Sequence, residues 1–290
     1  MGLPPGRSVA YLEVMKTALL ACFGAAALLA EPAAPAGLLV DLDAARGLTL
    51  DAQGRVAKWV NQAGPAEARD FVGQDKGRKV PGSGLPAVVK DGAAPALAFR
   101  AQELLCHDEK AFDGLVKGDG CTWVAVLKPY AQAKGGLKDV NSFFGNLRNG
   151  GKYEGVWGCL DDDNTLWWGA RNGLTFGRFD VNNPKVAGPK LEAGRRYVVA
   201  GRLGAGTGEV AIELFVDEPK AVAARRFPVN PSADSSKLSI GQERDATQHP
   251  GFESFDGEIG RFLLWARPLK DEELATVMAS LRAVPAATGK

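Results

Sequence analysis

Residues 251–283 read GFESFDGEIGRFLLWARPLKDEELATVMASLRA, and this stretch decides the fold. Residues 259–265 form a mostly apolar run of strand length, which is typical of a strand covered on both faces. Pro268 cannot donate to a strand ladder, so it ends the strand, and the acidic residues 271–273 suit the first turn of a helix. One face of that helix is apolar, at Leu274, Val277, Met278 and Leu281. The stretch predicts a buried strand followed by one short helix.

The rest of the chain consists of short apolar runs separated by turns rich in Gly, Asn and Asp. Runs of this length at close spacing, without long helical patterns, predict one antiparallel β-sandwich. Residues 61–95, rich in Gly, Pro and Lys, are expected to form a long connection, and 109–116 a single helical turn. The expected strands are 38–43, 56–60, 96–99, 122–127, 141–147, 153–160, 165–170, 174–181, 196–203, 210–216, 221–227 and 238–242.

The closing stretch also carries a family resemblance, at positions Phe255, Gly257, Ile259, Trp265, Arg267, Leu269 and Glu272 or Glu273. These residues resemble the closing strand of concanavalin A-like, laminin-G-like jelly-roll domains. Residues 37–64, the Pro-rich stretch that ends with residues 96–99, and residues 118–129 are similar to the opening strands of the same family. The resemblance covers residues 37–284. It implies an all-β fold, an antiparallel two-sheet jelly-roll sandwich with a short C-terminal helix, in which Asp41 and Asp43 are structural acids of the opening strand.

Residues 1–30 have the pattern of a secretory signal, because Met15-Lys16-Thr17 precede an apolar run that is too short to span a bilayer and ends at Ala30. Met15 is the preferred start, since Glu13 interrupts the positive charge before it. A buried N-terminal helix is the alternative. Residues 31–36 form a Pro/Ala linker, and residues 285–290 form a tail. We therefore expect an exported protein, periplasmic, cell-surface or extracellular, with no membrane span in the mature chain.

The charge balance limits the partners. Removing residues 1–30 takes away two basic residues and one acidic residue, which leaves 33 of each sign. Without a basic stripe, neither nucleic acid nor an anionic membrane is an expected partner, and a glycan or another extracellular ligand is favoured. The sequence leaves the oligomeric state open.

Three cysteines remain in the mature chain, Cys106, Cys121 and Cys159. An odd number in an exported protein is compatible with one disulfide and one free thiol, or with no disulfide. If a disulfide forms, Cys106 and Cys121 are the preferred pair, because both lie near the start of an expected strand. Three buried, reduced cysteines are the alternative.

Catalytic residues are not evident. Glucanases of the concanavalin A-like class commonly carry E-x-D-x-E on one strand, and the nearest string here, 253–258, places Glu253 and Glu258 on opposite faces. His107 and His249, the only histidines, have no nucleophile motif nearby. No phosphate-binding glycine motif supports a nucleotide cofactor.

Two clusters of oxygen-bearing side chains are candidate calcium ligands, one with Asp161 and Asp163 and one with Asp180 and Asn182. Both clusters are also good turn formers, because Asp and Asn side chains bond to their own backbone. We favour the turns, with calcium as the alternative.

Aromatic residues give the best argument for binding. Tyr153, Trp157 and Trp167 fall on two adjacent expected strands, and flat rings suit the C–H face of a sugar. Trp167 and Trp168 are consecutive, so they point to opposite sides of the sheet. Leu166 shares a face with Trp168, which predicts that Trp168 is buried and that Trp167 stands on an open face as a ligand contact.

These observations favour an exported, non-catalytic recognition domain that binds carbohydrate. A secreted glycoside hydrolase or polysaccharide lyase on the same fold is one alternative. A cell-envelope domain with a structural or protein-binding role is another, because a fold fixes neither ligand nor chemistry.

Overall fold

The computed structural model describes Gly2 and residues 34–73, 84–91, 94–132, 138–149, 152–243 and 253–283. Apart from Gly2, the expected signal segment 1–30 lies outside the described residues, as do residues 31–33 of the linker and the tail 285–290. Within the described ranges, no helix is both long and apolar enough to cross a membrane.

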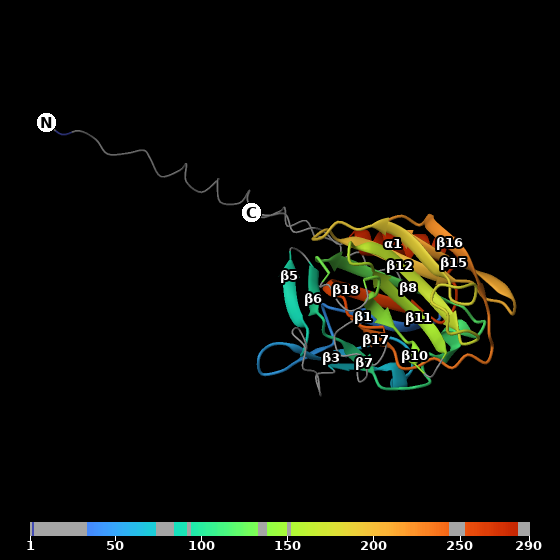
Figure 1. The fold of residues 1–290 in the computed structure, drawn as a ribbon. Coiled ribbons are helices and arrows are strands. Elements are labelled where there is room, and N and C mark those ends of the chain that lie inside the picture. The colour runs from blue at the N-terminus through green and yellow to red at the C-terminus, as the bar shows by residue number, and fades with distance from the viewer. Residues whose placement is uncertain are drawn as a thin grey trace. The chain divides into compact units, whose positions relative to one another are not determined.

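One sheet has eight antiparallel strands (Figure 1). They are β1 (Leu38–Asp43), β5 (Ala87–Asp91), β6 (Ala94–Arg100), β8 (Cys121–Pro129), β14 (Tyr197–Leu203), β15 (Glu209–Val216), β16 (Ala221–Pro228) and β18 (Asp256–Trp265). Their spatial order is β16-β15-β14-β8-β18-β6-β5, and β1 also pairs with β18. The strand that the closing stretch predicted is therefore central.

The other sheet has ten strands, which are β2 (Leu48–Leu50), β3 (Val56–Val60), β4 (Asp70–Gly73), β7 (Leu104–Cys106), β9 (Asn141–Gly145), β10 (Arg148–Asn149), β11 (Tyr153–Leu160), β12 (Thr165–Asn172), β13 (Lys185–Lys190) and β17 (Ser239–Ile240). Their order is β13-β12-β11-β9-β17-β7-β4-β3-β2, with β10 beside β11. Two 3₁₀ turns complete the set, η1 (Ala66–Ala68) and η2 (Asp113–Val116). The predicted all-β, two-sheet sandwich is confirmed.

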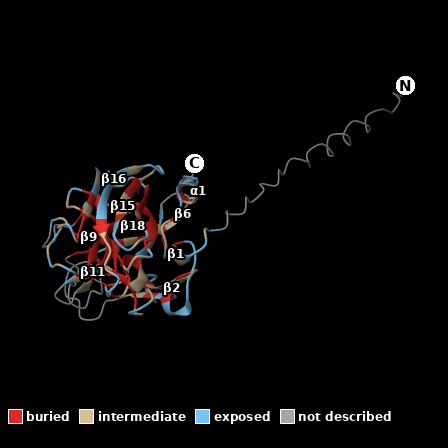
Figure 2. Cartoon of the chain, turned by 90° about the vertical axis from the view of Figure 1, so that its right-hand side faces the viewer, coloured by how far each residue is buried: buried red, intermediate tan, exposed pale blue. Residues whose placement is uncertain are grey.

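Strand β18 is covered on both faces, as its apolar run predicted. Phe262 and Leu264 are fully buried in the main core between the sheets, while Leu263 and Trp265 belong to a second cluster outside the eight-stranded sheet. Helix α1 (Asp271–Arg282) supplies the other side of that second cluster. In Figure 2 the strands inside the sandwich are drawn mostly as buried.

The start of α1 is fixed by charge as well as by packing. Glu273 accepts a hydrogen bond from the backbone N–H of Lys270 at 2.8 Å, which satisfies a donor that the first helical turn leaves unpaired. Both oxygens of Glu273 also bind the guanidinium of Arg267, at 2.7 and 2.8 Å. The Arg267 side chain and this backbone bond lower the pKa of Glu273 to about 2.

Two sequence-based expectations about local structure are wrong. Residues 61–95 were expected to be a long connection between strands, but they contain η1, β4 and β5. Residues 174–181 were expected to be a strand, but they lie in the connection 173–184 between β12 and β13. Side-chain bonds to the local backbone, described below, compete with a strand ladder in that connection.

Candidate functional site

The candidate site lies on the face of the ten-stranded sheet that points away from the main core. Side chains alternate along β11 and β12, so each strand contributes to both faces. Trp168 packs in the core between the sheets, whereas Trp157, Cys159 and Trp167 form a separate buried cluster. The prediction that Trp167 and Trp168 occupy opposite faces, with Trp168 buried, is confirmed.

The prediction that Trp167 stands open is wrong, since it is fully buried. Its indole meets Trp157 edge-on at a centroid distance of 4.8 Å and Phe179 at 5.3 Å. Its ring N–H donates to the carbonyl of Asp139 at 2.9 Å. Trp157 is only 3% exposed, so neither tryptophan is an open platform. Phe179 covers both rings, and it comes from the connection that was expected to be a strand.

The open part of this face is a stacked pair of rings, Tyr153 and Phe176. Their centroids are 5.1 Å apart and their planes differ by 26°. Tyr153 is half-buried at the start of β11, while Phe176 is 59% exposed. Leu174 and Val181 on the same connection are also exposed, at 50% and 81%. Exposed apolar groups on one short segment are typical of an interaction surface.

Asp180 organises the connection 173–184. One of its carboxylate oxygens accepts hydrogen bonds from the N–H of Asn182 and the side chain of Asn183, at 2.9 and 3.1 Å. The other oxygen accepts from the hydroxyl of Thr175 at 2.7 Å. Phe179 has a φ of 59°, a left-handed conformation that a strand cannot contain. Asp180 and Asn182, candidate calcium ligands in the sequence, thus take part in the turn.

The other calcium candidates also have protein partners. Asp161 lies 3.0 Å from the ammonium of Lys185, and burial raises the pKa of Asp161. Asp163 accepts a hydrogen bond from the N–H of Thr165 at 2.9 Å, in the turn that joins β11 to β12. Among the residues that the structure describes, no three His, Cys, Asp or Glu side chains are grouped as a metal site.

Arg171 on β12 is a member of the site that the sequence analysis did not single out. Its guanidinium carbon lies 4.6 Å from the ring centroid of Tyr153 and 4.9 Å from that of Trp157. Only 2% of the residue is exposed. The alternation that placed Trp167 on this face also places Arg171 there, four residues later, and could have identified it. Phe176 is a second member of the site that the sequence analysis did not single out.

Two buried acids lie near the aromatic cluster. Burial is the main cause that raises the pKa of Cys159, and the negative charges of Glu243 and Glu253 raise it further. The backbone carbonyl of Glu253 accepts a hydrogen bond from the N–H of Ser142 on β9, at 3.2 Å. Glu243 and Glu253 are only 3% and 7% exposed. The site therefore combines aromatic rings with charges of both signs.

Glu258 belongs to a different part of the sandwich. It lies on β18 in the eight-stranded sheet, where the hydroxyl of Tyr130 donates to it at 2.5 Å and the ammonium of Lys128 is 3.3 Å away. Burial and this hydrogen bond raise the pKa of Tyr130 to about 12. Glu253 instead lies beside β9 of the ten-stranded sheet. Residues 253–258 thus contact the ten-stranded sheet at Glu253 and belong to the eight-stranded sheet at Glu258.

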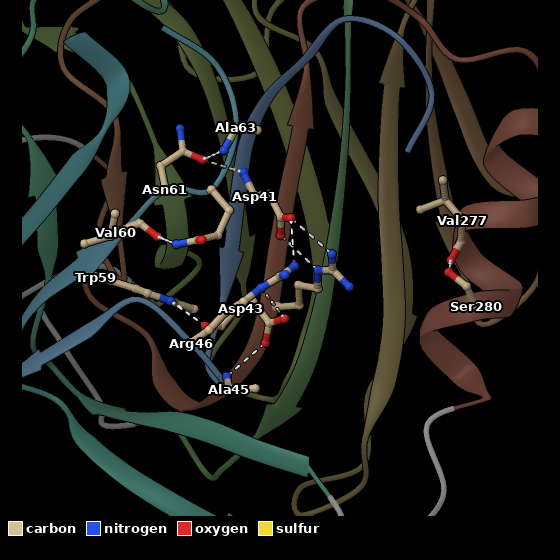
Figure 3. A network of polar contacts seen from close by, with 12 residues as sticks. Asp41, Asp43, Ala45, Arg46, Trp59, Val60, Asn61, Ala63, Val277 and Ser280 are labelled. Carbon is tan, nitrogen blue, oxygen red and sulfur yellow. Dashed lines mark hydrogen bonds and ion pairs between the residues drawn. The ribbon is translucent and has the colours of Figure 1, made fainter. Parts of the chain in front are cut away.

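The acids of the opening strand are structural, as the resemblance implied (Figure 3). The N–H of Asp41 donates to the side-chain oxygen of Asn61 at 2.7 Å. The carboxylate of Asp41 binds Arg261 at 2.9 and 3.1 Å, which ties β1 to β18. The ring N–H of Trp59 donates to the carbonyl of Asp43 at 3.0 Å. This network fastens the two sheets together.

The remaining reactive side chains lie outside the site or are buried. Cys106, Cys121 and Cys159 are free and buried, so the preferred pair of Cys106 and Cys121 is not formed and the reduced alternative holds. His107 is exposed, and His249 lies outside the described residues.

No protein-family model matches the sequence, and no curated protein matches it. Solved structures are similar in fold. A mutant sialidase of Trypanosoma rangeli with trans-sialidase activity has a TM-score of 0.53 at 15% identity, and covers 89% of this chain and 35% of its own. The sialidase of the same organism in complex with sialic acid has a TM-score of 0.51 at 17% identity, and the match covers 88% of this chain and 34% of the sialidase chain. A heptameric pentraxin of Limulus polyphemus has a TM-score of 0.41 at 16% identity, and covers 60% and 75%.

This chain therefore spans about a third of the length of the sialidases that it matches. At such low identity the likeness shows the fold alone, which is an antiparallel β-sandwich of two sheets.

Proposed function

We propose that the chain is an exported, non-catalytic recognition domain that binds carbohydrate at Tyr153 and Phe176. The observation that carries this proposal is the stacked ring pair on the outer face of the ten-stranded sheet, with Phe176 59% exposed. A flat ring offers an apolar face to the C–H side of a sugar, while the hydroxyl groups of the sugar stay hydrated. An exposed ring that is already stacked on a second ring loses little conformational freedom on binding.

The two buried tryptophans have a supporting role in this proposal. Trp157 and Trp167 pack beneath the connection 173–184 through Phe179, and they hold the exposed part of that connection against the sheet. A binding group that is held by packed neighbours keeps its geometry. Trp167 is thus a support for the site and not the ligand contact that alternation alone suggested.

The proposal rests on the site and not on the likeness to the sialidases. A shared fold at 15 to 17% identity does not fix a ligand, and the same sandwich serves many functions. Sialic acid is bound by one of these neighbours, which makes sugars a reasonable first class of ligand to screen.

The test is a glycan array probed with the wild-type protein, followed by titration of the best ligand. Phe176→Ala and Tyr153→Ala should weaken binding at least about tenfold, because a truncated central aromatic contact typically costs more than 1 kcal/mol. Leu50→Ala is the matched control, since Leu50 is 49% exposed on β2, away from the site. Absence of binding to any glycan, or equal loss in the control, would contradict the proposal.

Two further arms of the same experiment test the alternatives. Repeating the array with a chelator tests calcium, and loss of binding would assign the ion a role. Incubating the best ligand with the protein and measuring new reducing ends tests hydrolysis, for which the buried Glu243 and Glu253 are the candidate acids. If the protein hydrolyses the ligand, and Glu243→Gln or Glu253→Gln abolishes this activity, the chain is a hydrolase and not a non-catalytic binding domain.

Export is tested separately by mass spectrometry of the secreted protein. The signal pattern predicts cleavage after Ala30, or after Ala36 if the Pro/Ala linker is also removed. A secreted form that still begins at Met15 would contradict the predicted cleavage.

A further inference from the structure

Arg171 is a buried cation with unsatisfied donors. It is only 2% exposed, and its Nε and Nη1 have no hydrogen-bond partner in the described part of the chain. A guanidinium has five N–H donors and is not deprotonated in proteins. Buried donors are almost always paired, and an unpaired charged donor is costly, so this arginine is unusual.

The register of β11 and β12 explains how Arg171 is held. Arg171 lies opposite Gly155, which stands between Tyr153 and Trp157 on the same face of β11. The guanidinium carbon of Arg171 lies 4.6 Å from the ring centroid of Tyr153 and 4.9 Å from that of Trp157. A Cβ at Gly155 would come within 2.6 Å of the side-chain oxygen of Asn146, so the position is closed to larger residues.

Stacking against rings does not use the hydrogen bonds of a guanidinium. Cation–ring contacts generally involve the flat faces of a guanidinium, whereas its N–H groups point outward within its plane. These N–H groups form two forks, and each fork includes one of the nitrogens that lack a partner, Nε or Nη1. Arg171 is thus oriented by its neighbours without being neutralised by a hydrogen bond to any described residue.

Charges of both signs lie around Arg171. Burial is the main cause that lowers the pKa of Arg171, and the positive charge of Arg178 acts in the same direction. The carboxylates of Glu243 and Asp180 oppose this change. Asp180 bonds to three groups of its own connection, and Glu243 also has polar interactions of its own.

We infer that Arg171 determines the specificity of the glycan site by binding the carboxylate of an acidic sugar. This inference rests on the proposed function. Tyr153 connects the two parts of the site, because its ring stacks on the exposed Phe176 and also lies 4.6 Å from the guanidinium carbon of Arg171. The inference requires that the acid group of a sugar bound at this ring pair, or of the next sugar in the chain, reaches Arg171, and therefore that the groups covering the guanidinium move aside on binding.

A carboxylate fits these donors better than a neutral hydroxyl group does. A carboxylate is planar, and it accepts two parallel N–H bonds from one fork of a guanidinium. A neutral hydroxyl group would leave most of the buried charge uncompensated. A sulfate ester also accepts such bonds, so the experiment must separate the two anions.

The experiment compares three ligands on the wild-type protein by calorimetric titration: an oligo-uronate, the same oligosaccharide with its carboxylates reduced to alcohols, and a sulfated neutral oligosaccharide. The oligo-uronate should bind at least about tenfold more tightly than its reduced form, as expected when a charged hydrogen-bonded pair forms. It should also bind more tightly than the sulfated ligand. Added salt should weaken the acidic ligand only modestly, because buried ion pairs are poorly screened.

Variants then assign the preference to Arg171. Arg171→Lys, which keeps the charge but loses the fork, and Arg171→Met, which loses both, should bind the oligo-uronate and its reduced form almost equally. Arg225→Gln is the control, because Arg225 is exposed on β16 of the other sheet and should leave the preference unchanged. Arg171→Met should also keep or raise the thermal unfolding midpoint, since it removes a buried charge with unsatisfied donors.

The outcomes separate the two proposals. Equal binding of the oligo-uronate and its reduced form by the wild type overturns the inference and leaves carbohydrate binding intact. Tighter binding of the sulfated ligand overturns the carboxylate assignment. Binding of no glycan overturns the proposed function and the inference with it. If Arg171→Met lowers the unfolding midpoint markedly while the wild-type preference is absent, Arg171 is structural.

Discussion

Trp167→Ala tests whether the outer face of the ten-stranded sheet has a core of its own. A Trp→Ala change in a protein interior costs about 3–5 kcal/mol. Here the ring loses two edge-on contacts, to Trp157 and Phe179, worth about 0.5–1.5 kcal/mol each, and a hydrogen bond to Asp139 worth about 1 kcal/mol. Phe179 lies on a connection that can settle into part of the space, so we expect the lower end, about 3 kcal/mol.

The assay is equilibrium unfolding in urea, followed by circular dichroism because the change removes a fluorophore. Trp168→Ala is the matched control. Trp168 lies in the main core between two sheets that cannot collapse, and its loss should cost about 3–5 kcal/mol. A single transition with an unchanged slope is required before the free energies of unfolding are compared.

A loss of less than about 0.5 kcal/mol for Trp167→Ala, beside a large loss for Trp168→Ala, would show that the outer face of the ten-stranded sheet has no core of its own. It would instead support the open ring that strand alternation alone predicted. Acrylamide quenching gives an independent answer. All six tryptophans are at most 3% exposed, so their fluorescence should be poorly quenched, and strong quenching would contradict the burial of this cluster.

Three further predictions concern the rest of the domain. Phe262→Ala should destabilise the whole sandwich by about 2–5 kcal/mol in urea unfolding, because Phe262 is fully buried on the central strand; a loss below about 0.5 kcal/mol would make β18 peripheral. Arg267 lowers the pKa of Glu273 from 4.5 to about 2, so the ionised Glu273 contributes to the stability of the folded state above pH 4.5, and this contribution is lost as the pH falls toward 2. In thermal scans, the unfolding midpoint should depend less on pH in that window for Glu273→Gln but not for Glu272→Gln. Burial raises the pKa of Cys121 to about 12, and all three described cysteines are buried, so a thiol reagent at pH 8 should label them only after unfolding; rapid labelling of the native protein would contradict this.

Much of the fold could be predicted because its signals are local. The run 153–160 matches β11 at both ends, and the two-sided apolar run 259–265 correctly placed β18 at a sheet centre. Strands β4 and β5 were missed because their local signals are weak. Each is short and lies next to Gly, Pro or Lys, and β5 is at the edge of its sheet, where only one neighbour constrains its pattern.

The candidate site was only partly predictable because it depends on which segments pack over the outer face of the sheet. Alternation states which face of a strand a side chain takes, and it did so correctly for Trp167 and Trp168. It cannot state whether another segment covers that face. Phe179 reaches Trp167 only because Asp180 turns the connection back over the sheet, and that turn is decided by side-chain bonds and not by the hydrophobic pattern.

Three departures from local rules occur close together on one face of the sandwich. Residues 174–181 were expected to be a strand but form a connection. Phe176 is an exposed aromatic side chain, and the buried Arg171 has donors that no described residue satisfies. Natural sequences keep such conflicts mainly where function requires them. The same outer face of β11 and β12 therefore contains both the open rings and the unsatisfied cation, which is the combination that an acidic glycan would use.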